Sequence, residues 1–126
     1  MTGRESGMYI FYNPNPTGQF VGDCVIRAIA KATGQSWDDA YFHVAMQGYI
    51  EKNMPSANRV WGNYLKSIGF SKYTINANHT INQFAQENAG GVFVLGTGAH
   101  VVTVVDGDYY DAWDSGNEIP IYFFRR

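Results

Sequence analysis

The segment GQFVGDCVIRAIAKATG, residues Gly18–Gly34, decides how this chain is interpreted, because it places a lone cysteine at the start of an apolar helix. Beyond Cys24 only Arg27 and Lys31 are charged, and these two residues lie four apart on one side of a helix. We therefore predict a largely buried helix with one solvated stripe. Asp23 is the expected N-cap, and the glycine that closes the segment is the expected C-terminal stop.

A thiol in the first turn of a helix faces unpaired backbone N–H groups and the positive end of the helix dipole, and both favour the thiolate. Cys24 is therefore a candidate nucleophile. A lone cysteine is also among the most commonly buried residue types, so a packing role stays open at this point.

Composition favours one packed domain. The chain has 126 residues, of which 45% are hydrophobic and 16% aromatic, enough for one core and too few for two ordinary domains. We expect residues 1–126 to form a single domain. Nine basic and eleven acidic residues give a net charge of −2 with no long basic run, so we expect no nucleic-acid partner. One cysteine excludes an internal disulfide.

Targeting and cofactor signals are not found in the sequence. The N-terminal MTGRESG is polar and lacks the apolar segment of a signal peptide, and stretches such as HVVTVV are too short to cross a bilayer. We expect a cytoplasmic protein with no membrane partner. His43 and His79 lack metal-ligand spacing and no glycine-rich phosphate loop follows a strand, so we expect neither metal nor cofactor.

The first two thirds of the chain is predominantly helical in its patterning. After an extended start at Met8–Tyr12, Ser36 begins a capping box that predicts a second helix ending near Lys52. Apolar residues at helical spacing predict a third helix over 60–68 and a short fourth helix from Thr80 to the glycines at 90–91.

The last third of the chain has the patterning of strands. Four runs rich in β-branched and aromatic residues, VFVL, HVVTVV, YYDAW and IPIYFF, cover 92–95, 100–105, 109–113 and 119–124. We predict an α+β fold in which N-terminal helices, the first carrying the cysteine, pack on a C-terminal antiparallel sheet. The aromatic residues Trp37, Tyr41 and Phe42 are expected to belong to the core.

The hairpin between the second and third of these strands brings a histidine close to an acid. With Asp106-Gly107 as a two-residue turn, His100 faces Trp113, and Asp111 lies one diagonal step from His100 on the same face. A three-residue turn would bring Asp114 opposite His100 instead. Either acid could hold the imidazole tautomer while the histidine activates a thiol.

Each of these residues alone has a structural explanation, as a packed thiol, a strand-start histidine or a solvated acid. In combination, a cysteine at a helix start, a histidine at a strand start and a hairpin acid occur in the order expected for one design of cysteine hydrolase.

The segments GDCVIRAIAKATGQSWDDAY and GAHVVTVVDGDYYDAWDSGN resemble small papain-like cysteine peptidases of bacteria and their phages. They are also similar to the peptidase domains that cleave double-glycine leaders from bacteriocin precursors. In that superfamily an N-terminal helix presents the cysteine, and a following antiparallel sheet presents the histidine and then an Asn or Asp. The resemblance implies a papain-like fold with Cys24 as nucleophile, His100 as general base and acid, and Asp111 as orienting residue, with Asp114 as the alternative acid.

The resemblance also directs attention to an oxyanion hole. Papain-like enzymes usually place a glutamine several residues before the cysteine, where its amide joins the backbone N–H of the cysteine. Gln19 is the candidate here, five residues before Cys24 and one position closer than that spacing; Asn13 or Asn15 are alternative donors. The glycine that leader peptidases carry after the cysteine is Val25.

These observations predict a cysteine-dependent hydrolase, a peptidase or amidase that acts on a peptide or protein substrate through an acyl-enzyme on Cys24. A transferase or deamidase would use the same triad and differ in what attacks the acyl-enzyme. The alternative from another class is a catalytically silent papain-like fold that serves as a phage or mobile-element protein-binding factor, which the small size of the chain favours.

Overall fold

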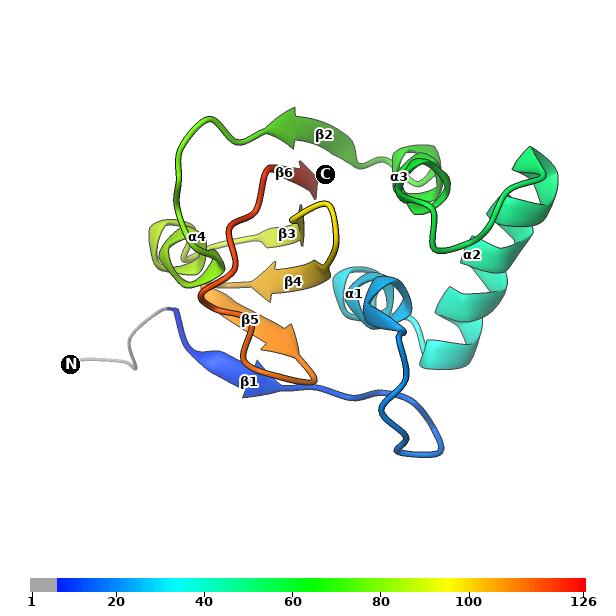
Figure 1. Cartoon of the computed structure of the whole chain (residues 1–126), viewed down its shortest axis with the longest axis horizontal. Coiled ribbons are helices and arrows are strands. Elements are labelled where there is room, and N and C mark those ends of the chain that lie inside the picture. Colours follow the sequence, from blue (N-terminus) through cyan, green and yellow to red (C-terminus); the bar gives the residue numbers. More distant parts are fainter. Residues whose placement is uncertain (1–6) are drawn as a thin grey trace.

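A mixed six-stranded sheet runs through the centre of the molecule, with helices on both of its faces (Figure 1). The computed structural model describes residues 7–126. The polar residues 1–6, in which the sequence predicts no signal peptide, lie outside the described range.

The described residues form four helices and six strands, and the sheet order is β1-β5-β4-β3-β6-β2. The helices are α1 (Cys24–Thr33), α2 (Trp37–Glu51), α3 (Asn58–Ser67) and α4 (Ile81–Glu87). The strands are β1 (Tyr9–Phe11), β2 (Ser71–Thr74), β3 (Val92–Gly96), β4 (Val101–Val105), β5 (Asp108–Asp111) and β6 (Tyr122–Arg125).

The central strands carry apolar side chains on both faces because helices cover both faces. In β3, Val94 packs into the core formed with α1, α2 and α3, whereas Phe93 and Leu95 pack into a second core with α4. Successive side chains of a strand point to opposite faces. A strand buried on both faces therefore has the unbroken apolar sequence VFVL that predicted it.

Helix α1 lies directly against the sheet and positions the cysteine. Thr103 of β4 donates a hydrogen bond through its hydroxyl to the backbone oxygen of Ala28 at 2.6 Å, in a fully buried contact. The helix ends where the sequence predicts, at Gly34 in the left-handed region with φ of 72°. Because α1 packs on β4, its first residue, Cys24, lies beside the start of that strand.

The prediction that Arg27 belongs to a solvated stripe of α1 is wrong. This residue is only 5% exposed, since it pairs with buried carboxylates. Asp23 occupies the N-cap position, but its side chain makes no capping hydrogen bond because it is engaged by other groups.

The prediction that the aromatic residues of α2 belong to the core is wrong for two of the three. Tyr41 and Phe42 are 51% and 63% exposed, whereas Trp37 is half-buried and packs against the core. Helix α2 buries mainly its small side chains, Ala40, Val44 and Gly48, against its neighbours, which leaves the larger aromatic side chains at the surface.

The predicted order of helices followed by an antiparallel sheet is only partly correct. Strand β1 precedes α1 and pairs in parallel with β5, with Tyr9 opposite Tyr109, so the sheet is mixed. Strand β2 lies between α3 and α4 and pairs with β6. Every residue of β2 is exposed, so its sequence, SKYT, lacks the apolar alternation that identifies a strand.

The hairpin between β4 and β5 has the predicted register. Asp106 and Gly107 both have positive φ, 48° and 87°, as a type I′ turn requires, and Val105 pairs with Asp108. Within residues 7–126, no helix combines the length and the apolar character needed to cross a membrane.

Candidate active site

Cys24 is the first residue of α1 and the cysteine around which the site is built. It is half-buried and not in a disulfide. The His100 side chain and the Val101 backbone lie close enough to its sulfur to lower the pKa of Cys24. The Asp23 carboxylate does not cap α1, so it accepts no hydrogen bond from the backbone N–H groups in the first turn of the helix.

His100 is held by a tight turn between β3 and β4. Its backbone N–H donates to Thr97 Oγ1 at 2.9 Å, and its carbonyl accepts from the Thr97 N–H at 2.9 Å. Gly98, inside this turn, has φ of 96°, which other residues rarely adopt. The turn places the imidazole between Cys24 and the end of β5, with 11% of the side chain exposed.

Asp111, the last residue of β5, is 1% exposed and accepts four hydrogen bonds. Its Oδ2 accepts from His100 Nε2 and from Ser115 Oγ, both at 2.6 Å. Its Oδ1 accepts from Arg27 Nη2 at 3.0 Å and from the Ala112 N–H at 2.8 Å. A carboxylate with four donors is fixed in orientation and remains ionised.

The alternative acid, Asp114, has other partners. Its Oδ1 accepts from the Tyr109 hydroxyl at 2.6 Å and from the Gly116 N–H at 3.0 Å. Of the two acids, the structure brings Asp111 to His100. Both residues lie just beyond the last residue pair between β4 and β5, whose register the two-residue turn sets.

Among the described residues, no hydrogen bond joins the predicted amide donors to Cys24. Gln19 is exposed and does not line the pocket beside the cysteine. Asn13 donates to the backbone oxygens of Gly18 and Gln19, and Asn15 accepts hydrogen bonds from Thr17, so both stabilise their own loop.

The three central groups shift one another's pKa values. Burial raises the pKa of Cys24, but the hydrogen bonds of its sulfur with His100 and Val101 and the charges of His100 and Arg27 outweigh burial and lower it. Burial also opposes charge on His100, yet its bonds to Asp111 and Cys24 raise its pKa to about 9. The pKa of Asp111 is lowered because hydrogen bonds from His100 and Ser115 exceed the cost of burial. Both shifts favour the charged forms, the thiolate of Cys24 and the imidazolium of His100, over those of isolated side chains.

Three contributing residues were not found from the sequence, although Trp113 was expected opposite His100. Trp113 lies against the imidazole, with ring centroids 4.8 Å apart, and Ser115 supports Asp111. Arg27 contacts both Asp111 and Asp23. Asp23 and Arg27 lie four residues apart at a helix start, and this spacing was the one sequence signal that could have indicated their ion pair.

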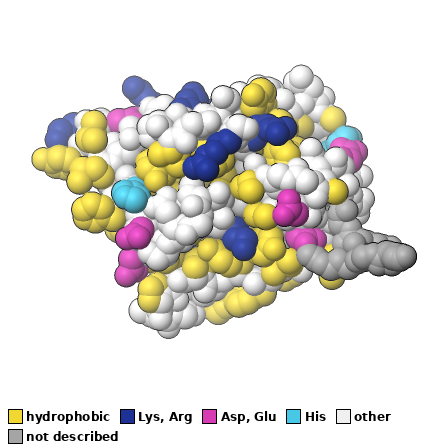
Figure 2. Space-filling model, turned by 180° about the vertical axis from the view of Figure 1, so that it is seen from behind, with side chains coloured by type: hydrophobic (Ala, Val, Ile, Leu, Met, Phe, Trp, Pro, Cys, Tyr) yellow, Lys and Arg dark blue, Asp and Glu magenta, His cyan; other side chains and the backbone are white. Residues whose placement is uncertain are grey.

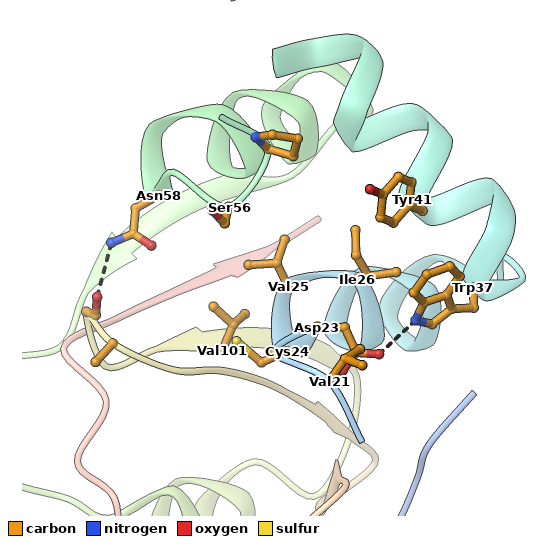
Figure 3. A pocket seen from close by; sticks show the side chains of 14 residues that line it. Val21, Asp23, Cys24, Val25, Ile26, Trp37, Tyr41, Ser56, Asn58 and Val101 are labelled. Carbon is orange, nitrogen blue, oxygen red and sulfur yellow. Dashed lines mark hydrogen bonds between the residues drawn. The ribbon is translucent and has the colours of Figure 1, made fainter. Parts of the chain in front are cut away.

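A pocket of about 480 Å³ opens beside Cys24, between the starts of α1 and β4 and the helix α2. Figure 3 shows Ile26 projecting from α1 toward Tyr41 and Trp37 of α2, while Val25 projects toward Ser56. On the opposite side, Asn58 Nδ2 donates to the Gly98 oxygen at 3.3 Å and so joins the start of α3 to the turn before β4 (Figure 3). The lining is mostly apolar. Its one carboxylate, that of Asp23, already accepts hydrogen bonds from Arg27 and Trp37.

Comparison with protein-family models, curated proteins and solved structures finds no match to this chain. Within residues 7–126, no group of three or more His, Cys, Asp or Glu side chains is placed to hold a metal ion.

Proposed function

We propose that the protein is a papain-like cysteine hydrolase that cleaves an amide or peptide bond through an acyl-enzyme on Cys24. The observation that carries the proposal is the imidazole of His100, which lies beside the Cys24 sulfur and hydrogen-bonds the buried carboxylate of Asp111. A nucleophile, a base and a group that orients the base are the elements of this kind of catalysis.

The chemistry follows from these contacts. His100 Nε2 is bound by Asp111, so the other ring nitrogen, Nδ1, serves the thiol. The Cys24 thiolate attacks the carbonyl carbon, the C–N bond breaks, and the protonated imidazole gives its proton to the leaving amine. Water then attacks the thioester carbonyl and gives its proton to His100. The C–S bond breaks, which releases the carboxylic acid product and regenerates the Cys24 thiolate. An acceptor other than water would make the same site a transferase, and release of ammonia would make it a deamidase.

The backbone N–H groups at the start of α1 are the donors we assign to the oxyanion. They lie at the positive end of the helix dipole, next to the sulfur, and the Asp23 side chain does not occupy them. This assignment differs from the predicted role of Gln19, a residue that is exposed and does not line the pocket.

The pocket favours a peptide or protein substrate with an apolar side chain in the acyl part. The leaving amine must lie on the His100 side of the sulfur, because it receives its proton there. The pocket touches Cys24 but is not lined by His100, so it accommodates the part that remains bound to the sulfur. Its walls, which include Val25, Trp37 and Tyr41, offer apolar contact and no unpaired charge.

Alkylation of Cys24 by iodoacetamide as a function of pH tests the proposal. An activated thiol reacts with a midpoint below the ordinary thiol pKa of about 8.5, and His100→Ala moves the midpoint upward. Fluorogenic peptides with apolar acyl parts then test turnover, with Cys24→Ala as the control. A midpoint near 8.5 in the wild type, together with no turnover that depends on Cys24, contradicts the proposal.

A second candidate function is that of a protein-binding factor without catalysis. Helix α2 exposes several large apolar side chains, and hydrophobic side chains gather at the end of the molecule that α2 occupies (Figure 2). They include Tyr41, Phe42, Met46, Tyr49 and Ile50, each between 44% and 69% exposed. Exposed apolar groups of this kind are common at protein interfaces. Retention of biological effect by Cys24→Ala would favour this candidate.

A further inference from the structure

Arg27 is a buried cation that joins two buried carboxylates. Its side chain is 7% exposed, and those of Asp23 and Asp111 are 5% and 1% exposed. Arg27 Nη2 donates to Asp111 Oδ1 at 3.0 Å, and Nη1 donates to Asp23 Oδ1. One planar guanidinium therefore connects the start of α1 to the end of β5.

The same contacts continue to the wall of the pocket. The second oxygen of Asp23, Oδ2, accepts a hydrogen bond from Trp37 Nε1 at 2.8 Å (Figure 3). Trp37 stacks on Tyr41 with ring centroids 5.2 Å apart, and both line the pocket. Arg27 thus contacts the triad acid directly and the pocket wall through one carboxylate.

Stability alone is a poor explanation for this arrangement. The desolvation cost of a buried ion pair often equals its attraction, so apolar side chains of similar volume would be as stabilising. Among the described residues, the buried Nε of Arg27 has no hydrogen-bond partner, which adds to the cost. A costly side chain in contact with the site acid indicates a role in the site.

We propose that Arg27 is a positioning residue that holds the triad acid Asp111 and, through Asp23, the pocket wall residue Trp37 in a fixed relation to Cys24. The inference rests on the proposed function, since it assigns Arg27 a role in that same site. Arg27 binds Asp111 through Oδ1, so Oδ2 faces His100. A fixed carboxylate keeps the imidazole in one tautomer and one orientation.

The charge of Arg27 also acts on the thiol. Asp23 immediately precedes Cys24, and an unpaired carboxylate there would disfavour the thiolate. Burial raises the pKa of Cys24, and Arg27 is one of the charges that lower it, after His100. Arg27 therefore offsets Asp23 at the point where the thiolate forms.

Other polar groups around this network come from β1 and α1. The Tyr9 hydroxyl of β1 donates to the backbone oxygen of Asp111 at 3.1 Å. Lys31, one turn further along α1, lies over the Tyr110 ring at 4.0 Å, so its charge is directed away from Asp111. Lys31 provides a matched control, because it is a long cation on the same helix outside the network.

Three variants separate the effects of charge and geometry. Arg27→Lys keeps the positive charge but lacks the fork that spans two carboxylates. Arg27→Met leaves two buried carboxylates without their cation. Arg27→Met combined with Asp23→Asn removes one charge of each sign, so it stays folded even where the single variant does not. Lys31→Met serves as the control.

The readouts are kcat and KM with an apolar peptide, the pH midpoint of Cys24 alkylation and the downfield NMR resonance of the His100 Nε2 proton. We expect Arg27→Lys and the double variant to lose about 10-fold to 100-fold in kcat and to broaden the Nε2 resonance, because the acid is no longer fixed. Arg27→Met raises the alkylation midpoint, and the added Asp23→Asn brings it back. Lys31→Met matches the wild type.

A cooperatively folded double variant with wild-type kcat and an unchanged Nε2 resonance would overturn the inference. The resonance and the alkylation midpoint need no substrate, so they test Arg27 independently of hydrolysis. If the wild type hydrolyses nothing while both signals respond to the Arg27 variants, the proposed function fails and the positioning role stands. If the wild type hydrolyses peptides and the variants match it, the positioning role fails and the proposed function stands.

Discussion

His100 Nε2 lies 2.6 Å from Asp111 Oδ2, although the two residues are eleven positions apart on either side of a hairpin turn. The contact is almost closed to solvent, since Asp111 is 1% exposed and the Trp113 ring packs against the imidazole. A short, charge-assisted hydrogen bond in a dry site is stronger than the same bond at a surface. It determines both the orientation and the protonation of the imidazole.

The first prediction is that His100 titrates at about 9 and that Asp111→Asn lowers this value. Burial works against the charged ring, so loss of the carboxylate removes the main group that opposes burial. The folded pKa exceeds the ordinary 6.5, so the imidazolium stabilises the fold fully below about pH 6.5. This contribution is lost as the pH rises through about 9. NMR titration of the three histidines checks the prediction, and a His100 value near 6.5 contradicts it.

A second prediction compares the two acids of the hairpin region. Asp111→Asn should lower kcat/KM by at least about 100-fold, because the amide cannot stabilise the imidazolium as the carboxylate does. Asp114→Asn is the matched control and should leave kcat/KM close to wild type, since Asp114 binds Tyr109 and Gly116 instead of His100. Steady-state kinetics of both variants decide the point, and the reverse ranking would show that Asp114 is the functional acid.

A third prediction concerns the pocket. Tyr41→Ala should raise KM for peptides with an aromatic residue in the acyl part and leave kcat nearly unchanged, because Tyr41 lines the pocket without touching the sulfur. Wild-type protein should prefer an apolar over a charged residue at this position by roughly 10-fold or more in kcat/KM. Equal turnover of acidic, basic and apolar peptides would mean that the pocket does not select the substrate.

The fourth prediction separates a reactive cysteine from a packed one. Cys24→Ala should abolish hydrolysis but cost only on the order of 1 kcal/mol in the free energy of unfolding, because the side chain is half-buried and leaves little cavity. Denaturant titration of both proteins provides the measurement. Phe124→Ala, which removes a 2% exposed core side chain, is the positive control and should cost about 3–5 kcal/mol.

The parts of this structure that sequence predicts are those set by local rules. The length and end of α1 follow from an apolar run closed by Gly34, and the contact of His100 with Asp111 follows from a two-residue turn and the period of a strand. These inferences need no knowledge of how distant segments meet.

The parts that sequence missed depend on distant segments. Strand β2 is exposed throughout, so nothing in its own residues distinguishes it from a loop until β6 pairs with it. Arg27 was expected at the surface because a charged side chain is rarely buried without a partner. The partner that allows its burial, Asp111, lies on a strand 84 residues away in the sequence. Gln19 was proposed from its spacing to Cys24, but the path of a loop cannot be derived from spacing alone.

The turn at Asp106 and Gly107 has a consequence for which changes the protein can accept. It lies at the far end of β4 from His100, roughly 17 Å away at about 3.4 Å per residue. A substitution that keeps both residues at positive φ leaves the site intact. An insertion or deletion of one residue there turns the face of β5 and moves Asp111 away from His100. At this remote loop, where changes of length are usually harmless, we expect natural variants to differ in residue type and to agree in length.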